Sequence, residues 1–177
     1  MNIAIWDLDN CLSSDEWRIP LIRWDEKDLE KRYLAYHDEC DIDLPANLLV
    51  FNAMRMITAP LFFTARPESV RRKTEEWIKH NLKVESPIVL MREEHNRGGA
   101  VEIKRMMFMK LILSLAAKHF KNLDTGEGEV DQQIDITNII AFDDRLDIVE
   151  MYHALGIRAQ QLKIHDVCAM TPPGANV

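Results

Sequence analysis

Short apolar runs alternate along this chain with longer stretches in which apolar residues recur every three or four positions. The short runs predict strands, because a strand buried on both faces of a parallel sheet is apolar throughout. They cover residues 3–6, 60–63, 87–91, 137–142 and 158–164. The longer stretches predict helices over residues 24–40, 46–57, 67–81, 100–119 and 146–155. This alternation predicts a doubly wound α/β domain built on a parallel sheet.

The segment after the first strand interrupts the alternation. Residues 12–45 lack a strand pattern and are predicted to form a small helical insert or cap, with Asp25 as the N-cap of its helix. Residues 122–135 are polar and are predicted to be a surface loop, and residues 166–177 a C-terminal tail. Without internal repeats or a linker, residues 1–165 are expected to form a single domain.

The composition is that of a globular protein, with 47% hydrophobic and 29% charged residues among 177. No apolar run is long enough to predict a membrane span, and the chain opens on a strand rather than a signal peptide. Its cysteines, Cys11, Cys40 and Cys168, are odd in number and widely spaced, which favours a reducing setting without a disulfide framework. We therefore expect a cytoplasmic protein.

The net charge of −7 bears on the class of partner. A protein that grips long nucleic acid through its phosphates carries a basic excess, so extensive duplex binding is not expected. A site for one terminal phosphate is compatible with this charge, and Arg66, Arg71, Arg72 and Lys73 could form a local basic rim. The oligomeric state cannot be predicted from the sequence.

Two aspartates follow the first predicted strand directly. Asp7 and Asp9 are two residues apart, so in extended backbone both point to one side at the carboxyl end of the strand, where open α/β sheets bind ligands. Carboxylates held this close repel each other unless a cation or proton lies between them, and Mg²⁺ prefers oxygen ligands. Asp41 and Asp43 share the spacing, but before Pro45 turn chemistry is the simpler interpretation.

Other strand ends and helix starts carry further polar residues. Thr64 and Arg66 follow the second strand beside a helix N-terminus, which is a good place to hold an anion. Lys104 lies near the start of a helix, where its charge opposes the dipole unless it faces acidic groups. Asp143 and Asp144 end the fourth strand. Two pairs of acids with cationic and hydroxyl donors suit metal-assisted phosphoryl transfer to an aspartate.

Four motifs of this chain resemble those of the haloacid-dehalogenase (HAD) superfamily of phosphohydrolases: Asp7-Leu-Asp9, Phe62-Phe-Thr64, Lys104 and Phe142-Asp-Asp144. The resemblance is closer to one branch, the 3′-phosphatase domain of bacteriophage-type polynucleotide kinase and its free-standing phage relatives. It covers nearly the whole chain, and the closer match is carried by Arg18, Trp77, Lys104 and residues 64–69, 90–93, 143–145, 149–151 and 155–156. The resemblance implies a Rossmann-like HAD fold, a Mg²⁺ cofactor and removal of phosphate from nucleotide or nucleic-acid 3′ ends.

The resemblance also implies a role for each matching residue. Asp7 is the nucleophile, and Asp9 is the acid that protonates the leaving oxygen and then activates water. The residues expected to bind the phosphate or lie at the substrate site are Thr64, Lys104, Arg18 and Arg66. The expected Mg²⁺ ligands are Asp7, Asp9 (through its backbone carbonyl), Asp143 and Asp144. A phage-encoded relative would act in the host-cell cytoplasm.

The sequence departs from the family pattern in three respects. Asn10 and Cys11 replace the usual Gly-Thr, which loses a hydroxyl but keeps a residue that tolerates a left-handed backbone. Ala100 replaces an acidic residue four positions before the motif lysine, so Lys104 lacks this support. The chain has no phosphate-binding loop, so phosphorylation of 5′ ends is not expected.

Three other interpretations use the same residues. A nucleoside monophosphate phosphatase (nucleotidase) would share the chemistry but act on free nucleotides. A non-catalytic nucleotide-binding HAD-like protein is disfavoured by the intact acids. A phospho-receiver module is disfavoured because Asp7 ends the first strand in sequence and Lys104 opens a helix.

Overall fold

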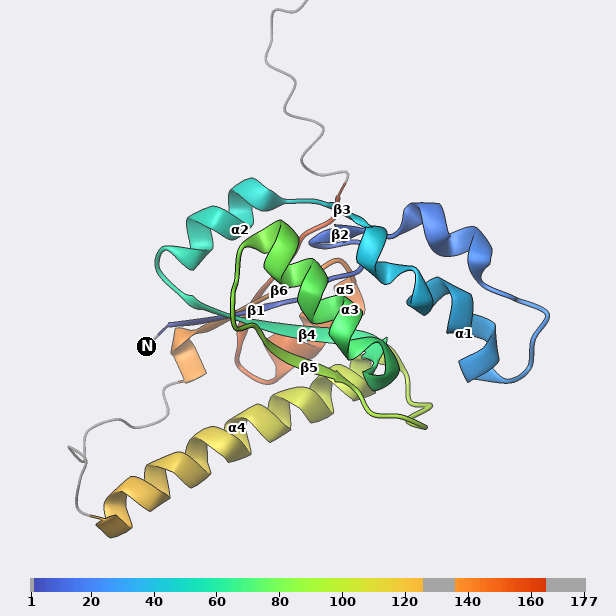
Figure 1. Ribbon diagram of the computed structural model, residues 1–177. Helices are drawn as coiled ribbons and strands as arrows, with labels where there is room; N and C mark the ends of the chain where they lie inside the picture. The colour runs from blue at the N-terminus through green and yellow to red at the C-terminus, as the bar shows by residue number, and fades with distance from the viewer. Residues whose placement is uncertain (1, 126–135, 165–177) are drawn as a thin grey trace, which may run out of the picture.

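A five-stranded parallel sheet lies at the centre of the computed structural model, which describes residues 2–125 and 136–164 (Figure 1). Its spatial order is β5-β4-β1-β6-β7. These strands are β1 (Ile3–Trp6), β4 (Ala59–Pro67), β5 (Ile88–Arg92), β6 (Ile139–Asp143) and β7 (Arg158–Gln161). The first strand is therefore central, and Ile5 pairs with Leu61 on one side and Ala141 on the other.

Helices cover both faces of the sheet, as the alternation predicts (Figure 1). One face carries α2 (Leu48–Arg55) and α3 (Arg71–Trp77), and the other carries α4 (Ala100–Thr125) and α5 (Leu146–Ala154). Short helical turns complete the connections: η3 (Glu68–Val70), η4 (Ile78–Leu82) and η5 (Ile136–Asn138).

Alternate residues of the central strand serve the two faces. Trp6 stacks on Phe142 with ring centroids 4.1 Å apart and meets the edge of Phe51 at 5.2 Å. Ile5 joins the opposite core with Tyr152 of α5. Because both sides of β1 are sealed by apolar packing, its carboxyl end is fixed in position, and so are the polar residues that follow it.

The insert begins and ends in a short antiparallel pair, β2 (Ser13–Ser14) with β3 (Leu44–Pro45). Between them lie η1 (Glu16–Leu21), α1 (Leu29–Asp38) and η2 (Cys40–Ile42). The insert lies beyond the carboxyl ends of β1 and β4, at the right of Figure 1. The insert therefore lies at the same edge of the sheet as the predicted strand-end aspartates.

Helix α1 is shorter than predicted, and Asp25 is not its N-cap. The carboxylate of Asp28 accepts the backbone N–H groups of Glu30 and Lys31 at 3.0 and 3.4 Å, so the helix begins at Leu29. Residues 24–28 form a loop, and the spacing of apolar residues alone does not distinguish such a loop from the first turn of a helix.

Two other boundaries also differ from the predictions. Pro67 ends β4 instead of starting a helix, and the helical turn starts at Glu68. Helix α4 continues to Thr125, so part of the predicted loop 122–135 is helical. The remainder of that loop and the predicted tail 166–177 lie outside the described residues.

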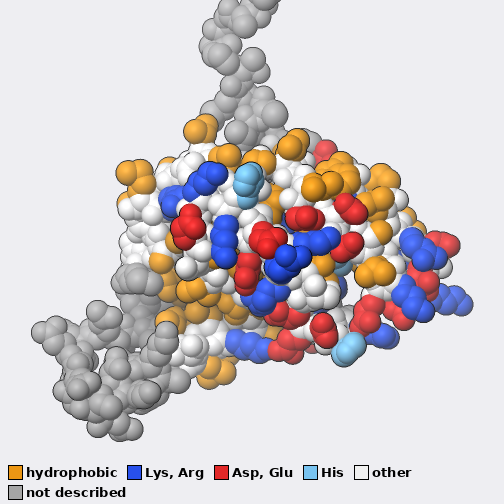
Figure 2. All heavy atoms as spheres, in the orientation of Figure 1, with side chains coloured by type: hydrophobic (Ala, Val, Ile, Leu, Met, Phe, Trp, Pro, Cys, Tyr) orange, Lys and Arg blue, Asp and Glu red, His pale blue; other side chains and the backbone are white. Residues whose placement is uncertain are grey.

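The predicted basic rim is wrong. Arg66 has no exposed surface, and the other three basic residues pair with acids. Figure 2 shows acidic and basic side chains interspersed on one face of the molecule. The pairs are Arg71 with Glu68 and Glu75, Arg72 with Glu76, and Lys73 with Asp38. Within residues 2–125 and 136–164, no helix combines the length and hydropathy needed to cross a membrane.

Candidate active site

Three carboxylates from distant parts of the chain meet at the carboxyl edge of the sheet. The backbone N–H of Asp7 donates to the carbonyl of Phe142 at 3.0 Å, which continues the pairing of β1 with β6. Asp143 ends β6, and Asp144 follows it. One oxygen of each of Asp7, Asp143 and Asp144 lies within 4.8 Å of the others. Parallel pairing of two adjacent strands thus assembles the acidic group.

Lys104 lies against this acidic group. It projects from the start of α4, is 2% exposed, and places its Nζ 2.7 Å from Asp7 Oδ1 and 2.5 Å from Asp143 Oδ2. These contacts explain a buried lysine near a helix start, where the dipole opposes its charge. Lys104 reaches the acids although Ala100 stands where the HAD phosphatases that the sequence resembles have an acidic residue.

The charges of this buried set do not balance. Three carboxylates face a single ammonium group, which leaves a formal excess of two negative charges. Burial raises the pKa of Asp7 well above its ordinary value, Lys104 opposes this shift, and Asp143 and Asp144 add to it. A divalent cation with a preference for oxygen ligands fits this donor set, so Asp7, Asp143 and Asp144 could hold Mg²⁺.

Asn10 and Arg145 orient two of the carboxylates. Asn10 has a left-handed backbone with φ of 56°, which confirms the predicted turn. Its side-chain amide donates to Asp144 Oδ2 at 2.9 Å, and the backbone N–H of Arg145 donates to Asp143 Oδ1 at 3.1 Å. Asn10, which stands where the resembled phosphatases usually have glycine, therefore both turns the chain and orients the Asp144 carboxylate.

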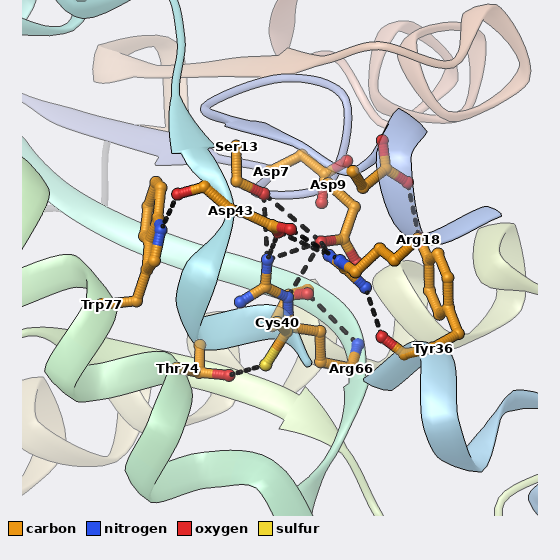
Figure 3. Close-up of polar contacts among 12 residues, drawn as sticks. Asp7, Asp9, Ser13, Arg18, Tyr36, Cys40, Asp43, Arg66, Thr74 and Trp77 are labelled. Carbon is orange, nitrogen blue, oxygen red and sulfur yellow. Dashed lines mark hydrogen bonds and ion pairs between the residues drawn. The ribbon is translucent and has the colours of Figure 1, made fainter. Parts of the chain in front are cut away.

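The side chain of Asp9 points toward Arg18 and Arg66 and belongs to a second group of charged side chains (Figure 3). Arg18 NH2 and Arg66 NH2 each lie 2.6 Å from Asp9 Oδ1. Both arginines also bind Asp43: Arg18 through Nε at 2.7 Å and NH2 at 2.6 Å, and Arg66 through NH2 at 3.0 Å. Two arginines and two aspartates give this group balanced charge.

Asp9 is held ionised in this arrangement. Burial alone would raise its pKa, but the contacts with Arg66 and Arg18 outweigh burial and hold the pKa well below its usual range. Its carboxylate is not part of the oxygen group formed by Asp7, Asp143 and Asp144. A metal contact through the Asp9 backbone carbonyl stays a prediction.

Asp43 is the principal residue that sequence reasoning missed. Turn chemistry was the wrong interpretation, because the Asp43 side chain has no exposed surface and the backbone carbonyl of Asp43 accepts the Trp77 indole N–H at 2.8 Å. Its Oδ1 also accepts the indole N–H of Trp17 at 3.0 Å. The available signal was the Asp-x-Asp spacing at residues 41–43, which matches that of Asp7 and Asp9.

The residues predicted to hold phosphate differ in their placement. Thr64 is fully buried, and its hydroxyl accepts the backbone N–H of Arg66 at 3.2 Å. The register of β4 with β5 shifts between Phe63 and Pro67, and this irregularity brings Ala65 to the wall of a cavity. Lys104 lines the same cavity, whereas Thr64, Arg18 and Arg66 are fully buried and do not line it.

This cavity has a volume of about 670 Å³ and lies between the sheet edge and the insert. Its floor includes Asp7, Asp9, Lys104 and Asp144. Sequence reasoning missed several residues of its other walls, namely Asp15, Tyr36, His37, Gly98 and Gly99. His37 is buried, and burial lowers its pKa to about 3. The cavity opens directly on the acidic group, so a phosphate ester bound there would meet Asp7.

Comparison with solved structures places this geometry among known folds, although no protein-family model and no curated protein matches the chain. A Clostridium difficile protein provisionally assigned as a phosphatase has a TM-score of 0.58 at 11% identity, over 97% of this chain and 91% of that one. The chain therefore has a Rossmann-like α/β fold, which it shares with that protein.

Two structures of the Pnkp1/Rnl/Hen1 RNA repair complex also match, over 90% of this chain each. Their TM-scores are 0.58 and 0.57, at 18% and 20% identity. This chain spans only 42% and 45% of the length of those two chains. At these identities the likeness shows the fold alone.

Proposed function

We propose that the protein is a metal-dependent phosphohydrolase that removes phosphate from a nucleotide or a polynucleotide 3′ end through an aspartyl-phosphate intermediate. The observation that carries this proposal is the meeting of Asp7, Asp143 and Asp144 beside Lys104 at the floor of a cavity. The resemblance of the surrounding motifs to HAD phosphatases gives each of these residues its role.

In the first step Asp7 attacks phosphorus. A bond forms between an Asp7 carboxylate oxygen and phosphorus, and the bond from phosphorus to the sugar oxygen breaks. Lys104 faces the negative charge that spreads over the phosphoryl oxygens. Asp9 gives a proton to the departing sugar oxygen, which requires it to be protonated and therefore to give up its contacts with Arg18 and Arg66.

In the second step water restores the enzyme. Asp9, now a carboxylate, takes a proton from water, and the water oxygen forms a bond to phosphorus. The bond to the Asp7 oxygen breaks, and inorganic phosphate leaves. When bound, Mg²⁺ would supply the positive charge between carboxylate and phosphate, held by Asp7, Asp143 and Asp144.

Two observations bear on the class of substrate. The Pnkp1 matches come from an RNA repair complex, which favours a nucleic-acid end. The net charge of −7 and the paired basic residues of α3 favour short substrates, so a nucleotidase is the second candidate.

The test is phosphate release from a 3′-phosphorylated oligonucleotide and from 3′- and 5′-mononucleotides, each with Mg²⁺ and with EDTA. We expect release with Mg²⁺ only, and Asp7→Asn should abolish it while the circular dichroism spectrum is retained. Asp147→Asn is the matched control, because Asp147 is half-exposed and pairs with Arg145 outside the acidic group. An active Asp7→Asn protein would rule out the covalent mechanism, and no release from any ester would favour a non-catalytic protein.

A further inference from the structure

The cavity has two chemically different sides. The sheet edge supplies Asp7, Asp9, Asp144 and Lys104, whereas the insert supplies the polar residues Asp15, Glu16 and His37 and a separate group of apolar and aromatic side chains. We define the insert wall as the five apolar and aromatic residues that line the cavity from η1, the loop after it and the start of α1: Ile19, Ile22, Trp24, Leu29 and Tyr33. A phosphate at Asp7 would leave the rest of its substrate facing this wall.

Three members of the insert wall are exposed although they are large and apolar. Trp24 is 64% exposed, Ile19 43% and Leu29 37%. An aromatic side chain as large as that of Trp usually buries most of its surface. Exposed apolar residues that cluster around a cavity often mark a ligand-binding site. The exposure of Trp24 therefore points to an occupant that covers its face.

The loop that carries Trp24 is fixed to α1. The backbone N–H of Arg23 donates to the carbonyl of Arg32 at 3.1 Å, and Arg32 Nε donates to the carbonyl of Glu26 at 2.7 Å. The Trp24 ring meets Tyr33 edge to face, with centroids 6.3 Å apart and planes at 78°. Bonds on both sides of Trp24 thus hold the indole in place before any ligand binds.

A nucleobase is the occupant whose chemistry suits this wall. It is flat, uncharged and aromatic, and it stacks on indole and phenol rings without regard to sequence. A cavity of about 670 Å³ lies within the usual size range for small-molecule sites. A sugar phosphate or a phosphorylated peptide without an aromatic group would leave the indole uncovered.

We propose that the insert wall is a stacking subsite for the nucleobase of the terminal nucleotide, with Trp24 as its main contact. This inference rests on the proposed function for the position of the phosphate. It adds that the enzyme recognises a base at the scissile end, and that the insert, not the sheet, provides that recognition.

The test compares esters with and without a base. Binding of adenosine 3′-monophosphate, adenosine 5′-monophosphate and abasic ribose 3-phosphate to Asp7→Asn protein with Mg²⁺ is measured by calorimetry. We expect the affinity of the better-bound nucleotide to exceed the affinity of the abasic ester by about 5- to 100-fold. In that protein, a second substitution Trp24→Ala should remove most of this difference without changing binding of the abasic ester, and Trp24→Phe should restore much of it.

Leu34→Ala is the control, because Leu34 is a 67% exposed apolar residue of α1 that does not line this cavity. Equal affinity for nucleotide and abasic ester, or no effect of Trp24→Ala, would overturn the subsite. Turnover by the wild-type protein is measured in parallel with the same esters. Hydrolysis of the nucleotides and the abasic ester without base preference would support the phosphatase proposal and contradict the subsite. Base-selective binding without hydrolysis would support the subsite and contradict the phosphatase proposal.

Discussion

The guanidinium of Arg18 binds both carboxylate oxygens of Asp43, at 2.7 Å through Nε and 2.6 Å through NH2, and neither side chain has exposed surface. This two-point pair joins the start of the insert to its end. The same Arg18 Nη2 lies 2.6 Å from Asp9 Oδ1, so the pair also connects the insert to Asp9 at the floor of the cavity. Asp43 therefore positions the arginine that contacts the proposed acid.

Replacement of Asp43 by alanine should destabilise the fold and reduce activity together. The change leaves Arg18 and Arg66 buried with one carboxylate between them, and an uncompensated buried charge costs about 3–5 kcal/mol of unfolding free energy. Urea unfolding measures this loss. Asp41→Ala is the control, because exposed Asp41 lies 3.8 Å from Lys73 and should change stability by less than about 1 kcal/mol. Equal losses for the two variants would contradict the role of Asp43.

Replacement of Lys104 by methionine should make the protein more dependent on Mg²⁺. The variant keeps the side-chain length but leaves three carboxylates without their ammonium partner. We expect turnover to fall by about 100-fold or more, because a charge that faces the phosphoryl group is lost. We also expect added Mg²⁺ to raise the melting temperature of the variant more than that of the wild type.

Thermal unfolding in EDTA and in Mg²⁺ gives this comparison. Lys110→Met is the control, because Lys110 lies on the same helix, is exposed and pairs with Glu93. An equal Mg²⁺ shift in all three proteins would mean that Lys104 and the cation do not share the acidic group.

The sheet and the acids at its edge could be predicted because both arise from local pattern. Apolar runs identify β1 and β6, and parallel pairing then requires Asp7 and Asp143 to share one edge. Lys104 could be anticipated for a similar reason, since its position near a helix start is unfavourable unless acids are near. Such inferences need only strand order and helix direction.

The second charge group could not be predicted in the same way. Asp43 and Arg18 are 25 residues apart, and the two-residue strands β2 and β3 that join the ends of this segment are too short to give a pattern in the sequence. Long-range pairing inside an irregular insert depends on how its loops close, and residue spacing does not encode that closure. The spacing at 41–43 was visible, but only burial distinguishes an ion-pair partner from a turn residue.

His37 should make the protein less stable as the pH falls. Burial lowers its folded-state pKa to about 3, while an unfolded histidine titrates near 6.5. Its contribution is complete above pH 6.5 and is lost as the pH falls toward 3, because the unfolded chain binds the proton more readily. Neutral imidazole also fits its partner, since Arg92 NH2 lies 3.3 Å from Nε2 and can only donate.

Urea unfolding between pH 7 and pH 4 tests this dependence. At pH 5 the contribution of His37 should have fallen by about 2 kcal/mol, and His37→Gln should flatten that part of the curve. His80→Gln replaces an exposed histidine and should leave the slope unchanged. A wild-type slope that persists in His37→Gln would assign it to other groups.

Asn10 should affect metal affinity more than stability. Its amide donates to Asp144 Oδ2 at 2.9 Å, so Asn10→Gly removes the group that orients this carboxylate while glycine accommodates the φ of 56°. Loss of a hydrogen bond to a ligand typically weakens metal binding by about 10- to 100-fold. Mg²⁺ titration of turnover gives the apparent affinity, and thermal unfolding in EDTA gives the stability.

Lys83→Gly is a matched control for the backbone effect. Lys83 has φ of 54°, is exposed and ends η4, away from the acidic group. Both glycine variants relieve a left-handed residue and loosen the unfolded chain, so their stability changes should be similar and small. Only Asn10→Gly should need more Mg²⁺ for half-maximal turnover. If both variants keep the wild-type requirement, the hydrogen bond from Asn10 does not prepare Asp144 for the cation, and its replacement of the usual glycine is merely a second way to turn the chain.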